Sequence, residues 1–186
     1  MTKAERIKIE FIAKRMERAV SHRFPLIEPT ADDNRRDLKW WLDVLDAKAF
    51  LFSMNGSAAW LFPHYELRLA PLTKRVVVES AGVILVDSHR CFEFHETAHA
   101  RQIYVPREEV RFQHLFETET LTFCPFKGLA KYYGVKADGN EVDDAFWSYE
   151  EIYDKFPDNG NASDIVRLKG MLSPDRSRVD VKILDA

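Results

Sequence analysis

The chain has 186 residues, with 27 Lys and Arg against 30 Asp and Glu, a formal net charge of -3 and an apolar fraction of 46%. These values fit one soluble domain, with or without an extension, that can build its core without disulfides or a structural metal. Scattered basic residues in a nearly balanced chain exclude the concentrated positive surface that nucleic-acid binding requires. No apolar run is long enough to span a membrane, and the N-terminus is charged where a signal peptide is apolar. We therefore expect a cytoplasmic protein.

Residues 1–60 carry helical patterns. Thr2 and Glu5 form a capping-box pattern before apolar residues at helical spacing, and Thr30 and Asp33 repeat the pattern before a second apolar stripe. The sequence therefore predicts an N-terminal helical extension packed on the rest of the chain.

From residue 61 onward the pattern changes to short strands. Runs typical of strands occupy residues 75–80, 83–88, 121–126, 131–137 and 178–184. The pairs Ala81-Gly82 and Asp138-Gly139 are tight-turn signals between such runs. We therefore predict an α+β chain in which residues 61–186 form a mainly antiparallel β domain, closed into a small barrel or a tent-like sandwich.

Six segments of this region form a recognisable series. They are VDSHR at 86–90, Glu96-Thr97, YVPREEV at 104–110, CPFKGLAKYY at 124–133, WSY at 147–149 and RVDV at 178–181. In order and spacing they resemble the domain-of-unknown-function family 427 over residues 64–186. The resemblance implies a compact, mainly β domain of uncharacterised activity. The chain departs from the family pattern at Phe126, at Leu172-Ser173 and in its N-terminal region.

The resembled family has carried a nucleotidyltransferase-like label. Such an enzyme binds a triphosphate and its metal through a Gly-Ser motif with spaced aspartates, or through a P-loop. The sequence contains neither motif. We therefore give the label little weight.

The stretch from His95 to His99 matches the His-Glu-x-x-His motif of zinc peptidases, in which both histidines bind the metal and the glutamate activates water. That chemistry requires a helix, whereas this stretch follows a strand-like run. The resemblance implies that Glu96-Thr97 ends a strand and begins a loop. Outside a helix, two histidines four positions apart do not bring their imidazoles together. We expect no cofactor, with a zinc site at His95 and His99 as the alternative.

The motif CPFKG contains two candidate functional side chains. Cys124 becomes a nucleophile only as a thiolate, and Lys127 would lower the pKa of Cys124 if the two side chains converge. Lys127 could instead bind an anion, or act as a base if burial lowers its own pKa. Pro125 and Gly128 predict a sharp bend that presents side chains at the rim of a pocket. The structural alternative is a buried Cys124 and a solvated Lys127.

A third set combines the groups that a pocket needs to orient a polar organic molecule and to move a proton. Glu96 is the candidate general acid or base, and Arg107 the candidate clamp on a substrate carboxylate, phosphate or enolate oxygen. The alternative is that Arg107 lies in a surface turn and that the aromatic residues belong to the core. The candidate substrate-binding residues are Tyr104, Tyr132, Trp147, Cys124 and His95.

These residues lead to three functional hypotheses. The first is an enzyme without redox cofactor that uses general acid/base chemistry on a polar organic substrate, as a cyclase, isomerase, lyase or hydrolase, with Glu96, Lys127 and Arg107 as catalytic residues. The second is a non-catalytic module that binds a small molecule or a protein, and the third is a zinc hydrolase. For partners we expect a small molecule, no nucleic acid, no membrane and a possible homodimer formed through exposed strand edges.

Overall fold

The computed structural model describes residues 66–96, 99–153 and 163–185, together with Ile7, Glu10, Ser57, Ala59 and Phe156. Ile7 and Glu10 are helical, and the rest of the extension predicted over residues 1–60 lies almost entirely outside the described residues. None of the helices in the described part of the chain is long and apolar enough to cross a membrane.

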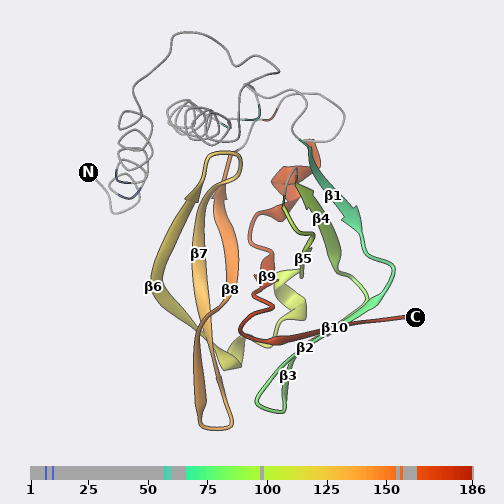
Figure 1. The fold of residues 1–186 in the computed structure, drawn as a ribbon, viewed down its shortest axis with the longest axis vertical. Helices are drawn as coiled ribbons and strands as arrows, with labels where there is room; N and C mark the ends of the chain where they lie inside the picture. The colour runs from blue at the N-terminus through green and yellow to red at the C-terminus, as the bar shows by residue number, and fades with distance from the viewer. Residues whose placement is uncertain are drawn as a thin grey trace, which may run out of the picture.

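The described chain is mainly antiparallel β structure arranged in three sheets (Figure 1). The first sheet has the order β1-β4-β5, the second β10-β2-β3 and the third β6-β7-β8-β9. The strands are β1 (Leu67–Pro71), β2 (Arg75–Ser80), β3 (Val83–Ser88), β4 (Phe92–Glu96), β5 (Gln102–Tyr104), β6 (Leu115–Cys124), β7 (Gly128–Ala137), β8 (Asn140–Ile152), β9 (Leu172–Pro174) and β10 (Asp180–Leu184). Three short 3₁₀ helices, η2 (Arg107–Glu109), η3 (Phe112–His114) and η4 (Ser163–Leu168), lie between strands.

The predicted mainly antiparallel β domain is confirmed, but the predicted closed barrel is wrong. A closed barrel needs one continuous ladder of strands, whereas here the strands are divided among three separate sheets. Backbone contacts nevertheless link two of the sheets: the N–H groups of Val105 and Leu172 each donate to the other residue's carbonyl oxygen, over 2.8 and 3.0 Å. The first and third sheets therefore meet at the junction of β5 with β9.

Both predicted tight turns are present. Ala81 and Gly82 join β2 to β3 with φ angles of 47° and 76°, and Asp138 and Gly139 join β7 to β8 with φ angles of 48° and 75°. Two successive residues with positive φ match the twist of the flanking strands, which is why two-residue hairpin turns favour small or polar residues. The local sequence therefore determines these two hairpins.

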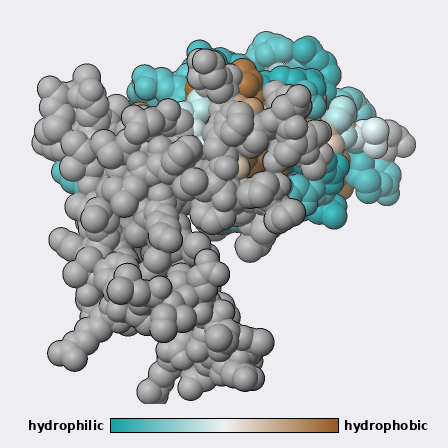
Figure 2. All heavy atoms as spheres, turned by 90° about the horizontal axis from the view of Figure 1, so that it is seen from above, coloured by the Kyte–Doolittle hydropathy of each residue, from teal (hydrophilic) through white to brown (hydrophobic). Residues whose placement is uncertain are grey.

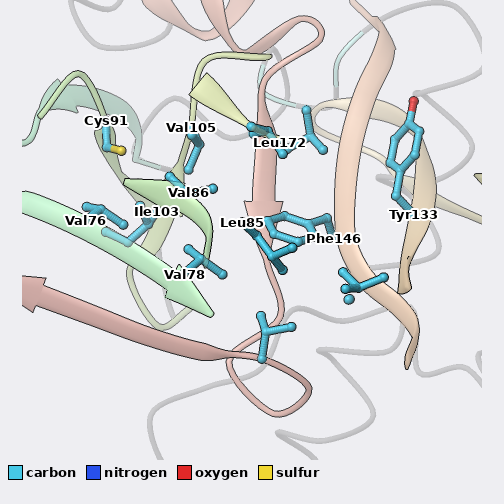
Figure 3. Close-up of a cluster of buried hydrophobic side chains, with 14 of the residues drawn as sticks. Val76, Val78, Leu85, Val86, Cys91, Ile103, Val105, Tyr133, Phe146 and Leu172 are labelled. Carbon is cyan, nitrogen blue, oxygen red and sulfur yellow. The ribbon is translucent and has the colours of Figure 1, made fainter. Parts of the chain in front are cut away.

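The largest core cluster collects side chains from all three sheets (Figure 3). Val76 and Val78 of β2 and Leu85 and Val86 of β3 are fully buried, and Phe146 of β8 packs in the same cluster. Burying one such side chain stabilises a fold by roughly 1.5 to 3 kcal/mol relative to exposing it. The shared core therefore fixes how the three sheets lie relative to one another.

Large apolar side chains are scarce on the described surface. The exposed ones are Val166, Ile183 and Leu184, and the last two lie on the edge strand β10. In the view of Figure 2 the described surface is mostly hydrophilic, with smaller hydrophobic areas between the polar ones. The expected homodimer stays a prediction.

Candidate active site

A pocket of about 430 Å³ lies between the first and third sheets. One wall comes from β4 and β5, and the other comes from β6, β7 and β8 with the turn between β6 and β7. Aromatic side chains from both walls line much of the pocket, and Lys127 and Glu96 contact each other within it.

Strand alternation determines which side chains of β4 reach the pocket. Phe94 and Glu96 both line the pocket, as expected of residues two apart on one strand. His95 points to the other face, where its Nε2 lies 2.7 Å from Oε2 of Glu93. His95 is therefore not among the residues that line the pocket, and its predicted role in substrate binding is not supported by its position.

The opposite wall follows the same rule. Trp147 and Tyr149 of β8 line the pocket, and Tyr132 of β7 lies opposite Trp147 in the antiparallel register. The hydroxyl oxygens of Tyr132 and Thr122 are 3.1 Å apart, which fixes the phenol against β6. The paired strands thus present three aromatic rings on one face.

The turn between β6 and β7 carries Lys127 into the pocket. Residues 125–127 join the facing positions Cys124 and Gly128, so the bend predicted from CPFKG is confirmed. Gly128 has φ +111°, and a Cβ there would lie 2.5 Å from the carbonyl oxygen of Glu151. Only glycine fits this conformation without strain.

Two hydrogen bonds from other parts of the chain hold this turn. The hydroxyl of Ser57 donates to the carbonyl oxygen of Phe126 over 2.7 Å, and the N–H of Tyr153 donates to the carbonyl oxygen of Lys127 over 3.2 Å. Ser57 is fully buried. The backbone on both sides of the Lys127 side chain is therefore anchored.

Lys127 and Glu96 form a buried ion pair between Nζ and Oε2. Their side chains are 6% and 9% exposed. The ammonium nitrogen also lies 4.8 Å from the centre of the Phe94 ring and 5.6 Å from that of Tyr149. The solvated lysine that the structural alternative required is therefore wrong.

The surroundings of Lys127 keep it protonated. Burial by itself lowers the pKa of Lys127, but the negative charges that Cys124 and Tyr104 carry once ionised, together with the charge of Glu96, raise this pKa above its ordinary value. A lysine base with a pKa lowered by burial is therefore not what this pocket holds. Lys127 is an ammonium, able to donate hydrogen bonds and to stabilise negative charge.

Two phenols and the thiol of the pocket keep their protons. Burial raises the pKa of Tyr104 to about 12, against the lowering effects of Lys127 and Trp147. Burial also raises the pKa of Tyr149 well above its ordinary value, and that of Cys124 even though Lys127 acts in the opposite direction. Cys124 is thus a neutral thiol in the free protein, and the thiolate that a nucleophile needs is disfavoured.

Arg107 lies elsewhere. It lines a separate cavity beside Pro106 and does not line the pocket of Glu96 and Lys127. Its guanidinium donates to Oε1 of Glu150 over 2.8 Å and to the hydroxyl of Tyr133 over 3.3 Å, and stacks 4.3 Å from the centre of the Phe112 ring. The structure therefore does not place Arg107, a predicted catalytic residue, in one pocket with Glu96 and Lys127.

The His-Glu-x-x-His match does not lie in a helix at its first two positions, because His95 and Glu96 end β4. His99 lines the pocket, whereas His95 faces away from it. Within the residues that the structure describes, no group of three or more His, Cys, Asp or Glu side chains is placed to hold a metal ion. The helical geometry that the zinc hypothesis requires is thus not found at this motif.

Sequence reasoning did not single out Phe94, Tyr149 or Ser57, which shape the site. Phe94 and Tyr149 could have been found by counting two positions from Glu96 and from Trp147, because residues two apart share a strand face. No local signal marks Ser57, since its contact with Phe126 spans 69 positions of the chain.

A comparison with models of protein families finds a match to this chain. A family model matches residues 68–183, a range that contains β2 to β9 and the pocket side chains described above. The family, with the short name NTP_transf_9, is described as a domain of unknown function (DUF427). A comparison with curated proteins finds no match to this sequence. Because the match covers more than half of the sequence, the chain belongs to the DUF427 family.

Proposed function

We propose that the pocket is the active site of an enzyme that transfers a proton on a small polar organic substrate, with Glu96 and Lys127 as its acid–base pair. The observation that carries the proposal is the buried ion pair between these two residues in the wall of the pocket. The free energy that two charges lose on leaving water often exceeds the free energy that they gain from attracting each other. A buried ion pair is therefore weak evidence for a stabilising role. Ionisable groups with perturbed environments in a cleft are candidates for catalysis.

The chemical step uses both charges. The Glu96 carboxylate takes a proton from a carbon next to a substrate carbonyl, so that the C–H bond breaks and an O–H bond forms on Glu96. The electron pair moves to the carbonyl oxygen, and the Lys127 ammonium stabilises the resulting enolate. Return of the proton to a different atom gives an isomerisation, and loss of a leaving group next to the carbanion gives an elimination. Neither outcome involves a net oxidation or reduction, so the step needs no redox cofactor.

The lining of the pocket supports this chemistry. Phe94 and Tyr149 lie against the ammonium, and exclusion of water by such rings strengthens electrostatic interactions within a site. Lys127 remains charged because its neighbours raise its pKa. The cation is therefore in place before negative charge develops.

The test follows proton transfer without knowledge of the natural substrate. The purified protein is incubated in heavy water with a panel of small carbonyl compounds, and proton NMR follows the replacement of C–H by C–D. We expect at least one compound to exchange faster than in buffer. In Glu96→Gln and in Lys127→Met this rate falls by about 100-fold or more.

A matched control separates catalysis from general damage. Lys131 and Glu117 form an exposed ion pair, with 2.9 Å between Nζ and Oε1, on the neighbouring strands β7 and β6. Lys131→Met and Glu117→Gln should leave the exchange rate unchanged. Equal exchange in wild type, Glu96→Gln and Lys127→Met would exclude the proposed mechanism, and a tightly bound compound that never exchanges would favour the non-catalytic binding module.

A further inference from the structure

The hydroxyl of Tyr104 has a proton to donate and no acceptor for it among the described residues. Trp147 Nε1 donates to the Tyr104 oxygen over 3.3 Å, so this contact occupies a lone pair and leaves the O–H free to donate. The side chain is 1% exposed, and its ring makes an edge contact with Phe94 at 5.7 Å between centres. Buried polar groups are almost always hydrogen-bonded. A donor left over in a pocket wall therefore points to an acceptor on a ligand.

Tyr149, on the opposite wall, also has a hydroxyl that is free to donate. Its side chain is 7% exposed and lines the pocket, and its hydroxyl has no hydrogen-bond partner within the part of the chain that the structure describes. Tyr104 comes from β5 and Tyr149 from β8, so the two phenols belong to different sheets. Burial raises the pKa of both, which keeps both as donors at neutral pH.

Lys127 is a third donor in the pocket, and it carries a positive charge. An ammonium has three N–H groups, and one of them is used by Glu96. The pocket therefore combines one cation with two uncommitted phenols, and such donors bind a carboxylate or an enolate oxygen most strongly because the acceptor is charged.

Asp175 is a further carboxylate that lines the pocket, but neighbouring residues of its own turn bind both of its oxygens. Its Oδ1 accepts hydrogen bonds from the N–H and the hydroxyl of Ser177, over 2.8 and 2.7 Å, and its Oδ2 lies 3.8 Å from Nε of Arg178. The repulsion that Asp175 would exert on an anion is therefore reduced.

We infer that the pocket binds small organic acids with a flat apolar body, and that the acid's oxygens accept hydrogen bonds from Tyr104, Tyr149 and Lys127. The rings of Phe126, Tyr132 and Trp147 supply the apolar walls that such a body packs against. The inference rests on the proposed function, because it names the substrate class of the same site. During the reaction the same donors would stabilise the enolate oxygen.

The test measures binding separately from turnover. Calorimetric titration compares phenylacetate with phenylacetamide, which has nearly the same shape and no charge. We expect the wild-type protein to bind phenylacetate about tenfold more tightly or better, and Tyr104→Phe and Tyr149→Phe each to reduce that preference by about fivefold to tenfold. Tyr133→Phe is the matched control, because the Tyr133 hydroxyl bonds Glu150 on the other face of the sheet and should leave the preference unchanged.

Three results would overturn the inference: equal affinity for the two compounds, an unchanged preference in both variants of the pocket tyrosines, or no binding of phenylacetate at millimolar concentration. A preference for phenylacetate without deuterium exchange in any compound of the panel, charged or uncharged, would keep the ligand class and remove the proposed function. Exchange confined to uncharged compounds, at full rate in Tyr104→Phe and Tyr149→Phe, would keep the proposed function and remove the ligand class.

Discussion

Lys127 and Glu96 lie 31 positions apart in the chain and form an ion pair that is almost fully shielded from water. The pair joins the turn after β6 to the end of β4, and therefore links the third sheet to the first. Removing one of the two charges leaves the other buried without its partner, so the two side chains are energetically coupled.

The first prediction concerns the cost of breaking this pair. Lys127→Met or Glu96→Gln alone should lower the free energy of unfolding by about 3 to 5 kcal/mol, because each leaves one buried charge without its partner. The double variant should recover most of that loss. Urea denaturation of the four proteins measures the coupling, and strictly additive losses would show that the two side chains act independently.

The exposed pair of Lys131 and Glu117 sets the scale for comparison. Its side chains are 38% and 56% exposed, so solvent screens their attraction. Lys131→Met and Glu117→Gln should each cost less than about 1 kcal/mol.

The second prediction concerns the turn that positions Lys127. Gly128→Ala forces a Cβ into a position 2.5 Å from the carbonyl oxygen of Glu151 at φ +111°, whereas Gly139 has φ +75° with no atom within 4 Å of such a Cβ. Gly139→Ala should therefore cost only the left-handed backbone strain, about 1 to 2 kcal/mol. Gly128→Ala should cost more and should also weaken phenylacetate binding. Equal losses in thermal or urea unfolding for the two variants would show that the contact with Glu151 has no effect.

Local chemistry explains which strands were predicted. β2 and β3 are runs of β-branched residues on either side of a tight turn, and they were predicted with the same bounds as in the structure. β8, the longest strand, was missed because NEVDDAFWSYEEI is rich in acidic residues, which are uncommon in strands. β5 and β9 have three residues each, and the bridge between Val105, which follows β5, and Leu172 of β9 joins residues distant in sequence.

The contacts of the site, like the bridge between the sheets, also join residues that are distant in sequence. Glu96 and Lys127 were both predicted as catalytic residues, but the sequence left open whether they converge, and the structure brings them into contact. Arg107 belongs, like both of them, to a segment that resembles the family, yet it lies with Glu150. Membership of such a segment therefore does not show which residues meet, because that depends on which strands lie side by side and in which register, and these strands are far apart in the sequence.

The third prediction concerns alkaline pH. Burial raises the pKa of Tyr104 from its ordinary value of 10.0 to about 12. Between these two values the unfolded chain has lost the phenol proton and the folded chain has kept it, so the free energy of unfolding falls as the pH rises. For Tyr104 the loss amounts to about 2 to 3 kcal/mol by pH 12. Urea denaturation at pH 9.5 and 11.5 should show a smaller loss for Tyr104→Phe than for the wild type, and parallel losses would contradict the raised pKa.

The last prediction separates Arg107 from the pocket. Its guanidinium is held by Glu150 and Tyr133 and stacks on Phe112, and none of these groups lines the pocket of Lys127. Arg107→Met should therefore destabilise the fold by about 1 kcal/mol, the net contribution of a partly exposed charged hydrogen bond and a ring contact. It should leave deuterium exchange and phenylacetate affinity at wild-type values, in contrast to Lys127→Met. If Arg107→Met instead abolishes exchange in a protein that unfolds like the wild type, then Arg107 acts on the substrate, and the active site extends beyond the pocket between the first and third sheets.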